Sequence, residues 1–430
     1  MTRPPSNTPM APNPALNQSS TSSDNARNGG LSSGIPTAAI IALSFGSFGS
    51  GMSMRVTDAM LVRLAADFHV ALGTAAMTIT VFGFAYGFSQ LLFGPLGDRY
   101  GKYLVIAWGC LACAITALAC GLMPNFSALL LARAIAGATC ASIIPLSMAW
   151  IGDVVPYEDR QPVLARFLIG QILGLTSGIL LGGFAADYLS WRAPFFLIAA
   201  SFFATGIYLI RMNGRLPEHA KQQHRAEGGA LMRLIGEFRK VLEVPWARKV
   251  LGTVLIEGAL VYGALAFIPS HLHTVHGVSL AAAGSLVMMF GFGGFAFAMR
   301  SRQMVTRFGE VGLIRNGALM MALPMIAVAY SPVWWLAVPA CFLFGLGFYM
   351  MHNTLQINAT QMAPQRRGAA VAAFASCFFV GQAAGVALGG ALLAQTGTAH
   401  IIAAAGVGVW VIGRRFARLR AVKEAQGVQP

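Results

Sequence analysis

Long apolar stretches of this sequence contain charged side chains where a charge is costly to bury, notably Asp58, Arg133 and Glu257. Asp187 lies at the outer edge of such a stretch, and we interpret it as a surface charge. A charge at the centre of a bilayer costs about 2.5 to 3.5 kcal/mol on insertion scales, so such groups usually bind an ion, a ligand or a partner. Glu257 is the leading candidate for binding and releasing a proton or another cation, with a structural hydrogen-bonding role as the alternative. Asp58 follows Arg55 by three residues on one helix face, so a local ion pair competes with a ligand-binding role.

Uncharged polar side chains in the same stretches could contact a ligand in a central cavity. The candidates are Gln171, His352, Asn353, Gln356 and Gln382. Because imidazole titrates near neutral pH, His352 suits proton sensing or cavity polarity, and a hydrogen-bonded core histidine is the alternative. Gln171 and Gln382 occupy matching positions of an internal repeat, which favours hydrogen bonding between helices.

Three histidines close together, His271, His273 and His276, raise the question of a metal site. Their spacings of two and three residues do not place all three on one helix face, and no carboxylate follows nearby. We therefore expect no metal and no cofactor. The sequence also shows no clustered catalytic constellation, so we expect the protein not to be an enzyme.

Twelve apolar segments position these side chains. The chain of 430 residues is 56% hydrophobic and 10% charged, whereas about a quarter of the residues in a soluble domain are charged. About 20 apolar residues suffice for a helix to cross a bilayer. The sequence therefore predicts an all-α membrane protein with twelve transmembrane helices, at 38–61, 72–95, 103–123, 126–152, 164–189, 192–212, 250–271, 280–302, 311–330, 332–358, 369–394 and 399–413.

Lys and Arg cluster in alternate gaps between these spans, for example at 99–102 and 211–249. The positive-inside rule assigns such gaps to the cytoplasm, so both termini are expected to be cytoplasmic. The net charge of +15 thus reflects membrane topology, and we expect no nucleic-acid partner.

The widest interior gap divides the chain into two sets of six spans. We predict a disordered cytoplasmic tail at 1–35 and a first six-helix bundle at 36–212. Residues 213–249 form a cytoplasmic linker whose apolar residues at helical spacing predict an amphipathic helix. A second bundle at 250–415 and a cytoplasmic tail at 416–430 complete the prediction.

The two halves carry an internal repeat. GQILGLTSG begins at Gly170, and GQAAGVALG begins at Gly381, about 211 residues later. Glycines at four-residue spacing let neighbouring helix backbones approach closely. The predicted packing positions are Gly170, Gly174, Gly178, Gly182, Gly381, Gly385 and Gly389. Applying the offset to the acidic residues places Glu257 near mid-membrane and Asp58 near the outer end of its span.

The stretch GPLGDRYGK, from Gly94 to Lys102, lies between the second and third predicted spans. It resembles the signature loop of the major facilitator superfamily, G-x-L-x-D-R-x-G-R/K, and the likeness covers about 38–415. Gly94 and Gly101 would permit a tight turn. The resemblance implies the major facilitator fold, with twelve helices in two pseudo-symmetric six-helix bundles. It also implies a conformational switch loop made of Gly94, Asp98, Arg99, Gly101 and Lys102, with Asp98 contacting the start of the eleventh span around 366–369.

A nucleotide-binding loop is excluded at this stretch. The spacing between its glycines is one residue short, and Tyr103 stands where Ser or Thr must bind magnesium. Transport would therefore be driven by a gradient.

Two further likenesses concern the coupling mechanism. LLARAIAG at 130–137 resembles the family motif whose arginine, here Arg133, is associated with proton coupling, and an arginine snorkelling to the outer surface is the alternative. The glycines of the fifth span resemble the antiporter motif, but Ile179 stands where that motif has proline.

The likeness to the bacterial drug and sugar efflux branches implies a secondary transporter that works by alternating access and exports a small organic or amphiphilic compound in a proton-coupled cycle. Proton-coupled uptake of a small organic solute is the alternative, and a transporter-like sensor is a further one. The expected partners are a small-molecule substrate, protons and the lipid bilayer. We expect a monomer in the inner (plasma) membrane.

Overall fold

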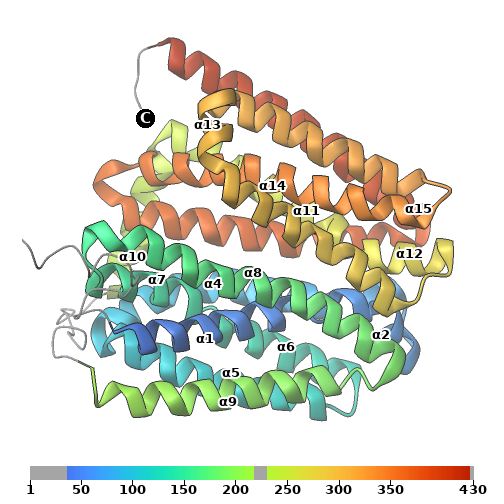
Figure 1. Ribbon diagram of the computed structural model, residues 1–430, viewed down its shortest axis with the longest axis horizontal. Helices are drawn as coiled ribbons and strands as arrows, with labels where there is room; N and C mark the ends of the chain where they lie inside the picture. Colours follow the sequence, from blue (N-terminus) through green and yellow to red (C-terminus); the bar gives the residue numbers. More distant parts are fainter. Residues whose placement is uncertain (1–35, 217–229, 427–430) are drawn as a thin grey trace, which may run out of the picture. The chain divides into compact units, whose positions relative to one another are not determined.

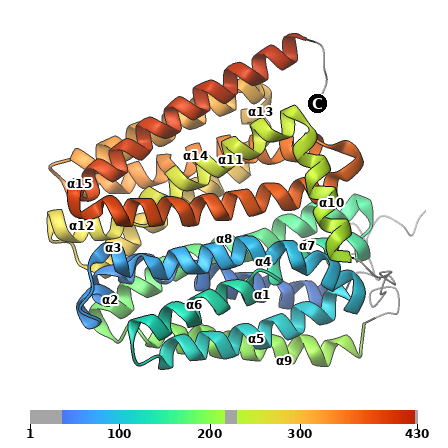
Figure 2. The same cartoon turned by 180° about the vertical axis from the view of Figure 1, so that it is seen from behind.

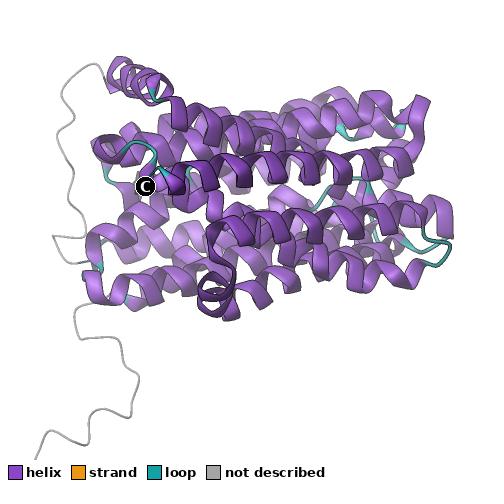
Figure 3. Cartoon of the chain, turned by 90° about the horizontal axis from the view of Figure 1, so that it is seen from above, coloured by secondary structure: helices purple, strands orange, loops and turns teal. Residues whose placement is uncertain are grey.

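The computed structural model describes residues 36–216 and 230–426. Backbone contacts define one body from Ala38 to Pro430, which contains every described helix except the first residue of α1. Among these described residues only helices and their connections occur, as Figure 3 shows. The predicted all-α class is confirmed, while the tail predicted at 1–35 lies outside the described residues.

The first half of the body, which we call the N-half (37–216), contains nine α-helices and one short 3-10 helix. They are α1 (Thr37–Arg55), η1 (Asp58–Met60), α2 (Leu61–Asp67), α3 (Leu72–Ala75), α4 (Met77–Tyr100), α5 (Lys102–Leu122), α6 (Phe126–Cys140), α7 (Ile143–Val154), α8 (Tyr157–Tyr188) and α9 (Ala193–Asn213).

The second half, the C-half (230–426), begins with α10, which lies in the predicted linker. Its elements are α10 (Ala230–Glu243), α11 (Pro245–Leu265), α12 (Ile268–His276), α13 (Leu280–Tyr330), η3 (Trp334–Leu336), α14 (Ala337–Gln361), η4 (Pro364–Arg366) and α15 (Arg367–Ala425). Figures 1 and 2 show α1 to α9 grouped together and α11 to α15 grouped together.

Within the described residues, ten helical segments are long and apolar enough to cross a membrane. Two of them each contain a backbone break, at Gly309 with φ 62° and at Gly397 with φ 72°. Glycine tolerates this left-handed region, so each break reverses the chain between two spans. Dividing α13 and α15 at these points adds two to the ten and gives the twelve predicted spans.

Glycines form a seam within each half. A Cβ at Gly174 of α8 would overlap the Phe48 carbonyl of α1, and a Cβ at Gly385 of α15 would overlap the Ala259 carbonyl of α11. Both members of the first contact lie 211 residues before their counterparts in the second. The repeat therefore describes two equivalent helix pairs packed backbone to backbone.

The two halves meet along α4 with α15 and along α8 with α13. We call the end of the body that contains Gly73 the Gly73 end, and the opposite end the Asp98 end. At the Gly73 end the backbones of Gly73 and Gly390 touch, and Asp187 accepts a hydrogen bond from the Ala281 N–H at 2.6 Å. Further toward the Asp98 end, Gln90 donates to Ser376 at 3.3 Å.

Two details differ from the sequence predictions. The tight turn predicted at Gly94 is wrong, because α4 continues without a break to Tyr100 and only Gly101, with φ 88°, leaves the helical region. A Cβ at Gly94 would meet nothing within 4 Å, so no close approach requires this glycine. At the other end of the chain, α15 continues to Ala425, well past the last predicted span.

Candidate functional site

Glu257 and His352 form a carboxylate–imidazole pair, which we call the dyad. Glu257 lies on α11 and is fully buried, and its Oε2 is 2.9 Å from Nδ1 of His352 on α14. The second carboxylate oxygen, Oε1, is buried and has no hydrogen-bond partner. Buried polar atoms are nearly always paired, so this free oxygen calls for an explanation.

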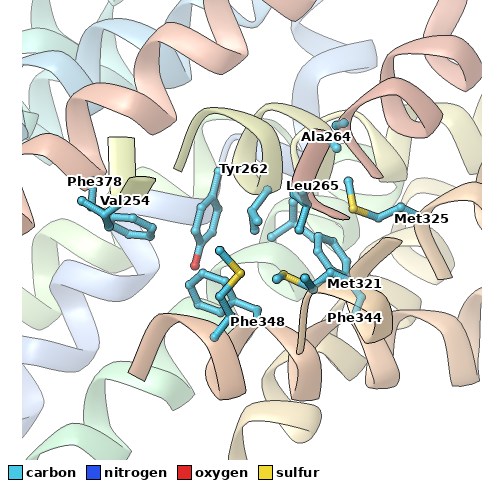
Figure 4. Close-up of a cluster of buried hydrophobic side chains, with 14 of the residues drawn as sticks. Val254, Tyr262, Ala264, Leu265, Met321, Met325, Phe344, Phe348 and Phe378 are labelled. Carbon is cyan, nitrogen blue, oxygen red and sulfur yellow. The ribbon is translucent and has the colours of Figure 1, made fainter. Parts of the chain in front are cut away.

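Aromatic rings surround the imidazole of the dyad. The His352 ring centroid lies 4.9 Å from Phe348, 4.6 Å from Phe378 and 5.4 Å from Phe374. Figure 4 shows Phe348 and Phe378 gathered around Tyr262, with which they make edge contacts at 5.6 and 5.4 Å. The side chain of His352 is 16% exposed, whereas that of Glu257 is 0% exposed. The dyad is thus an apolar-walled site in which one proton can be held between a carboxylate and an imidazole.

Arg55 and Asp58 form a second buried polar group. Arg55 Nη1 lies 2.9 Å from Asp58 Oδ2, and the two side chains are 2% and 1% exposed. Arg55 also reaches the C-half, because Nη2 donates to Gln382 Oε1 at 3.4 Å. The local ion pair that the spacing suggested is present, and it continues into a contact across the two halves.

Arg133 is completely buried on α6. Its guanidinium donates to the carbonyls of Ser53 at 2.9 Å and Thr78 at 3.3 Å, and it lies 4.2 Å from the ring centre of Phe82. A snorkelling arginine would be exposed, so the snorkelling alternative is excluded. Arg133 holds α1, α4 and α6 together, and its Nη2 has no hydrogen-bond partner.

The predicted switch loop makes its ion pairs within the N-half. Lys102 Nζ lies 3.5 Å from Asp98 and 2.7 Å from Asp153 at the end of α7. Asp98 was expected near 366–369, but Arg366 Nε lies 2.7 Å from Glu237 Oε2 of α10 instead. The described structure therefore joins Arg366 to the linker helix and Asp98 to its own half. The Arg99 guanidinium lies over the ring of Tyr100, and that of Arg307 lies over the ring of Phe308. Each ring directly precedes a glycine with positive φ, Gly101 or Gly309.

The remaining predicted residues take different places. Gln382 is buried at the contact with Arg55, whereas Gln171 and Asn353 are half-buried and Gln356 is exposed. Gln171 and Gln382 thus share a position in the repeat without sharing surroundings. His271 hydrogen-bonds to Thr398 at 2.8 Å and contacts the Val328 carbonyl at 3.2 Å, so its two ring nitrogens have protein partners.

Two features of the site lack a signal in the sequence. The contact between Arg55 and Gln382 joins residues 327 positions apart. Asp187, which we interpreted as a plain surface charge, is exposed and accepts a hydrogen bond at the start of α13. Carboxylates favour helix N-termini, but this one comes from another helix, so no capping pattern within α13 reveals it.

Comparison with known proteins supports the same fold. Residues 43–386 match the family model described as Major Facilitator Superfamily. An uncharacterized MFS-type transporter of Bacillus subtilis (strain 168), YwfA, is 26% identical over 374 residues, covering 86% of this chain and 88% of that protein. The multidrug export protein EmrB of Escherichia coli (strain K12) is 27% identical over 205 residues, which cover 47% of this chain and 40% of EmrB.

Solved structures share the architecture at low identity. The nucleoside transporter NupG matches with a TM-score of 0.71 at 15% identity, over 88% of this chain and 97% of that one. A peptide transporter POT in complex with sulfate also matches with a TM-score of 0.71, at 16% identity and over 90% and 94% of the two chains. At such identities the likeness establishes the fold alone.

Proposed function

The chain belongs to the major facilitator superfamily and is a multi-pass secondary transporter, and we propose that it exports a small organic or amphiphilic compound in exchange for protons. The observation that carries the coupling to protons is the dyad. A buried carboxylate with one free oxygen and one imidazole partner can gain or lose a proton without any other ion pair having to break.

The position of the dyad suits a coupling role. Glu257 precedes Gly258, whose absent side chain lets α11 approach the Phe378 carbonyl of α15. His352, on α14, contacts Phe378 as well, with ring centroids 4.6 Å apart. A change of charge at Glu257 therefore acts directly on the packing of three helices in the C-half, so protonation can bias the arrangement of that half.

Export is supported by the partial likeness to EmrB and by the glycine pattern of α8. Uptake stays the second candidate, because Ile179 stands where the antiporter motif has proline. Ile179 is buried, and its carbonyl lies against Gly284 of α13. A compound that raises the unfolding temperature of the purified protein serves as the transported probe. In proteoliposomes with an imposed pH gradient, we expect the probe to move against the direction of proton flow. If the probe moves in the same direction as the protons, the protein takes up its substrate, and the proposal of export is wrong.

We further propose that the Asp98 end faces the cytoplasm of a bacterial inner membrane, with both termini on that side. The basic gaps beside Lys102 and Arg248 support this orientation. A reporter that is active only in the cytoplasm should be active when it is fused to the C-terminus. A reporter that is active only outside should be active when it is inserted at Gly277, an exposed left-handed glycine between α12 and α13. A cytoplasmic signal at Gly277 would contradict the orientation.

A further inference from the structure

The first and seventh spans are interrupted at corresponding places. The helix α1 ends at Arg55, and η1 begins at Asp58 after two residues. In the C-half α11 ends at Leu265, and α12 begins at Ile268 after two residues. At both places the connecting residues Thr57, Ala266 and Phe267 keep right-handed helical backbone angles, so each is a local irregularity of a continuing span that the two repeats share.

Arg55 sits at the first of these breaks and touches both halves. Its guanidinium carbon lies 3.9 Å from the ring centre of Tyr262, beside the second break. Its other C-half partner, Gln382, is 3.4 Å away, and its N-half partner is Asp58. A guanidinium has five N–H donors arranged to meet a carboxylate in a bidentate way. Of these three contacts, the bond to Asp58 at 2.9 Å is the short one.

Asp58 is also incompletely paired. Its Oδ2 contacts Arg55, but its Oδ1 is buried without a hydrogen-bond partner. A buried ion pair is stable when further hydrogen bonds satisfy the remaining polar atoms, and this pair lacks them. Inside the protein, Asp58 Oδ1 can therefore still accept a hydrogen bond, and Arg55 Nη2 makes only a long hydrogen bond, to Gln382.

A small cavity adjoins this group. Its volume is about 20 Å³, which is space for about one water molecule. Arg55 is the charged residue of its lining, and the remaining wall includes Leu175, Tyr262, Phe290 and Tyr349. Because these residues come from both halves, a rearrangement of the halves changes the volume available beside the guanidinium.

We propose that Arg55 recognises the acidic group of the transported compound, which is a monoanionic organic acid with an apolar or aromatic body. The acid group takes the edge of Arg55 that Gln382 occupies, and Asp58 is its internal competitor. The apolar body lies against Tyr262, Phe290 and Tyr349. This inference rests on the proposed transport function, for which it names the substrate class.

The charge of the site supports an acid over an amine. Arg55 lines the cavity and Asp58 does not, so a ligand in the cavity meets the guanidinium, which attracts a carboxylate and repels an ammonium. A neutral amide could bond one edge but would lack the charge-assisted pairing that a carboxylate has with guanidinium. The site thus discriminates among compounds of one shape by their charge.

The test measures binding to the purified full chain in detergent. The probes are 2-naphthoate, 4-phenylbutyrate and octanoate, each compared with its own amide and amine through the shift in unfolding temperature. We expect an acid to produce its half-maximal shift at a concentration at least about tenfold below that of its amide or amine. Asp58→Asn, which removes the competing charge, should lower the required acid concentration by a further factor of about ten.

Two variants remove the recognition itself. Arg55→Lys keeps the charge but loses the planar fork, so the preference for acid over amide should fall at least about tenfold. The double variant Arg55→Gln/Asp58→Asn removes both charges together and should show no preference. The control is Arg63→Gln/Asp67→Asn, which removes an exposed ion pair in the same span and should keep the preference of the unaltered protein.

The proposal is overturned if no acid in the panel stabilises the protein more than its amide, or if Arg55→Lys keeps the full preference. Should the double variant fail to fold, Arg55→Lys and Asp58→Asn still decide the matter, since they are expected to act in opposite directions. These measurements need no ion gradient. Their failure would leave proton-coupled transport standing, and a failure of coupling in vesicles would leave binding at Arg55 standing.

Discussion

We expect Glu257→Gln to strongly reduce uphill transport driven by a pH gradient, while exchange of substrate across the membrane persists. Glutamine keeps the shape and hydrogen-bonding capacity of the side chain, so the contact with Nδ1 of His352 at 2.9 Å can be retained. It cannot bind and release a proton, so the cycle loses its link to the gradient. We expect the gradient-driven rate in proteoliposomes to fall at least about tenfold, which corresponds to about 1.4 kcal/mol.

The control for this prediction is Glu243→Gln on α10, whose carboxylate is 64% exposed and pairs with Arg239 at 3.7 Å. That variant should transport at the unaltered rate. If Glu257→Gln still moves substrate uphill as fast as the unaltered protein, the coupling role passes to Asp58 or Arg133. If exchange is lost together with uphill transport, Glu257 serves the structure or the substrate instead of the gradient.

Alanine at Gly174 or Gly385 should destabilise the folded protein more than alanine at a glycine of the spans with open space around it. A Cβ at either position would collide with a backbone carbonyl of the neighbouring helix, which no side-chain rotation relieves. Separating two packed helices by a methyl group costs about 1 to 3 kcal/mol, and the cost here lies at the upper end because backbone must move. The measurement is the unfolding temperature of each variant in detergent.

Gly252→Ala provides the matched control, because it lies in α11 and a Cβ there would meet nothing within 4 Å. Alanine is favoured over glycine in a helix by about 1 kcal/mol, so this variant should unfold at the same or a higher temperature. Equal losses of stability in all three variants would mean that the seam has no special part in holding the helices together.

Local and periodic features of this fold could be predicted from the sequence. The twelve spans follow from apolar length, and close helix packing follows from glycines at four-residue spacing, whereas the partner helices α1 and α11 emerge only from the structure. The turn at Gly94 could not be predicted correctly, because a glycine and a proline in a motif suggest a loop although the surrounding residues continue the helix. Pro95 is accommodated within α4.

The sequence indicated individual residues of the candidate site but not the contacts between them. Glu257 and His352 each attract attention as polar residues in apolar segments, but their sequence positions, 95 residues apart, give no sign that they touch. The same holds for Arg55 and Gln382. Such pairs depend on how two halves fold against each other, and neither helical periodicity nor charge patterning records that arrangement.

Glycine contacts are arranged differently within a half and between the halves. Within a half, four successive glycines of α8 rest on the carbonyls of Ser44, Phe48, Met52 and Val56. These four contacts in a row pack α1 and α8 against each other as one rigid pair. Between the halves, glycine contacts such as Gly73 with Gly390 and Gly183 with Leu280 are isolated, and they stand beside side-chain contacts such as Gln90 with Ser376. Glycine therefore serves two purposes in this protein. A row of glycines packs two helices of one half together along their length, whereas a single glycine lets the two halves touch at one point.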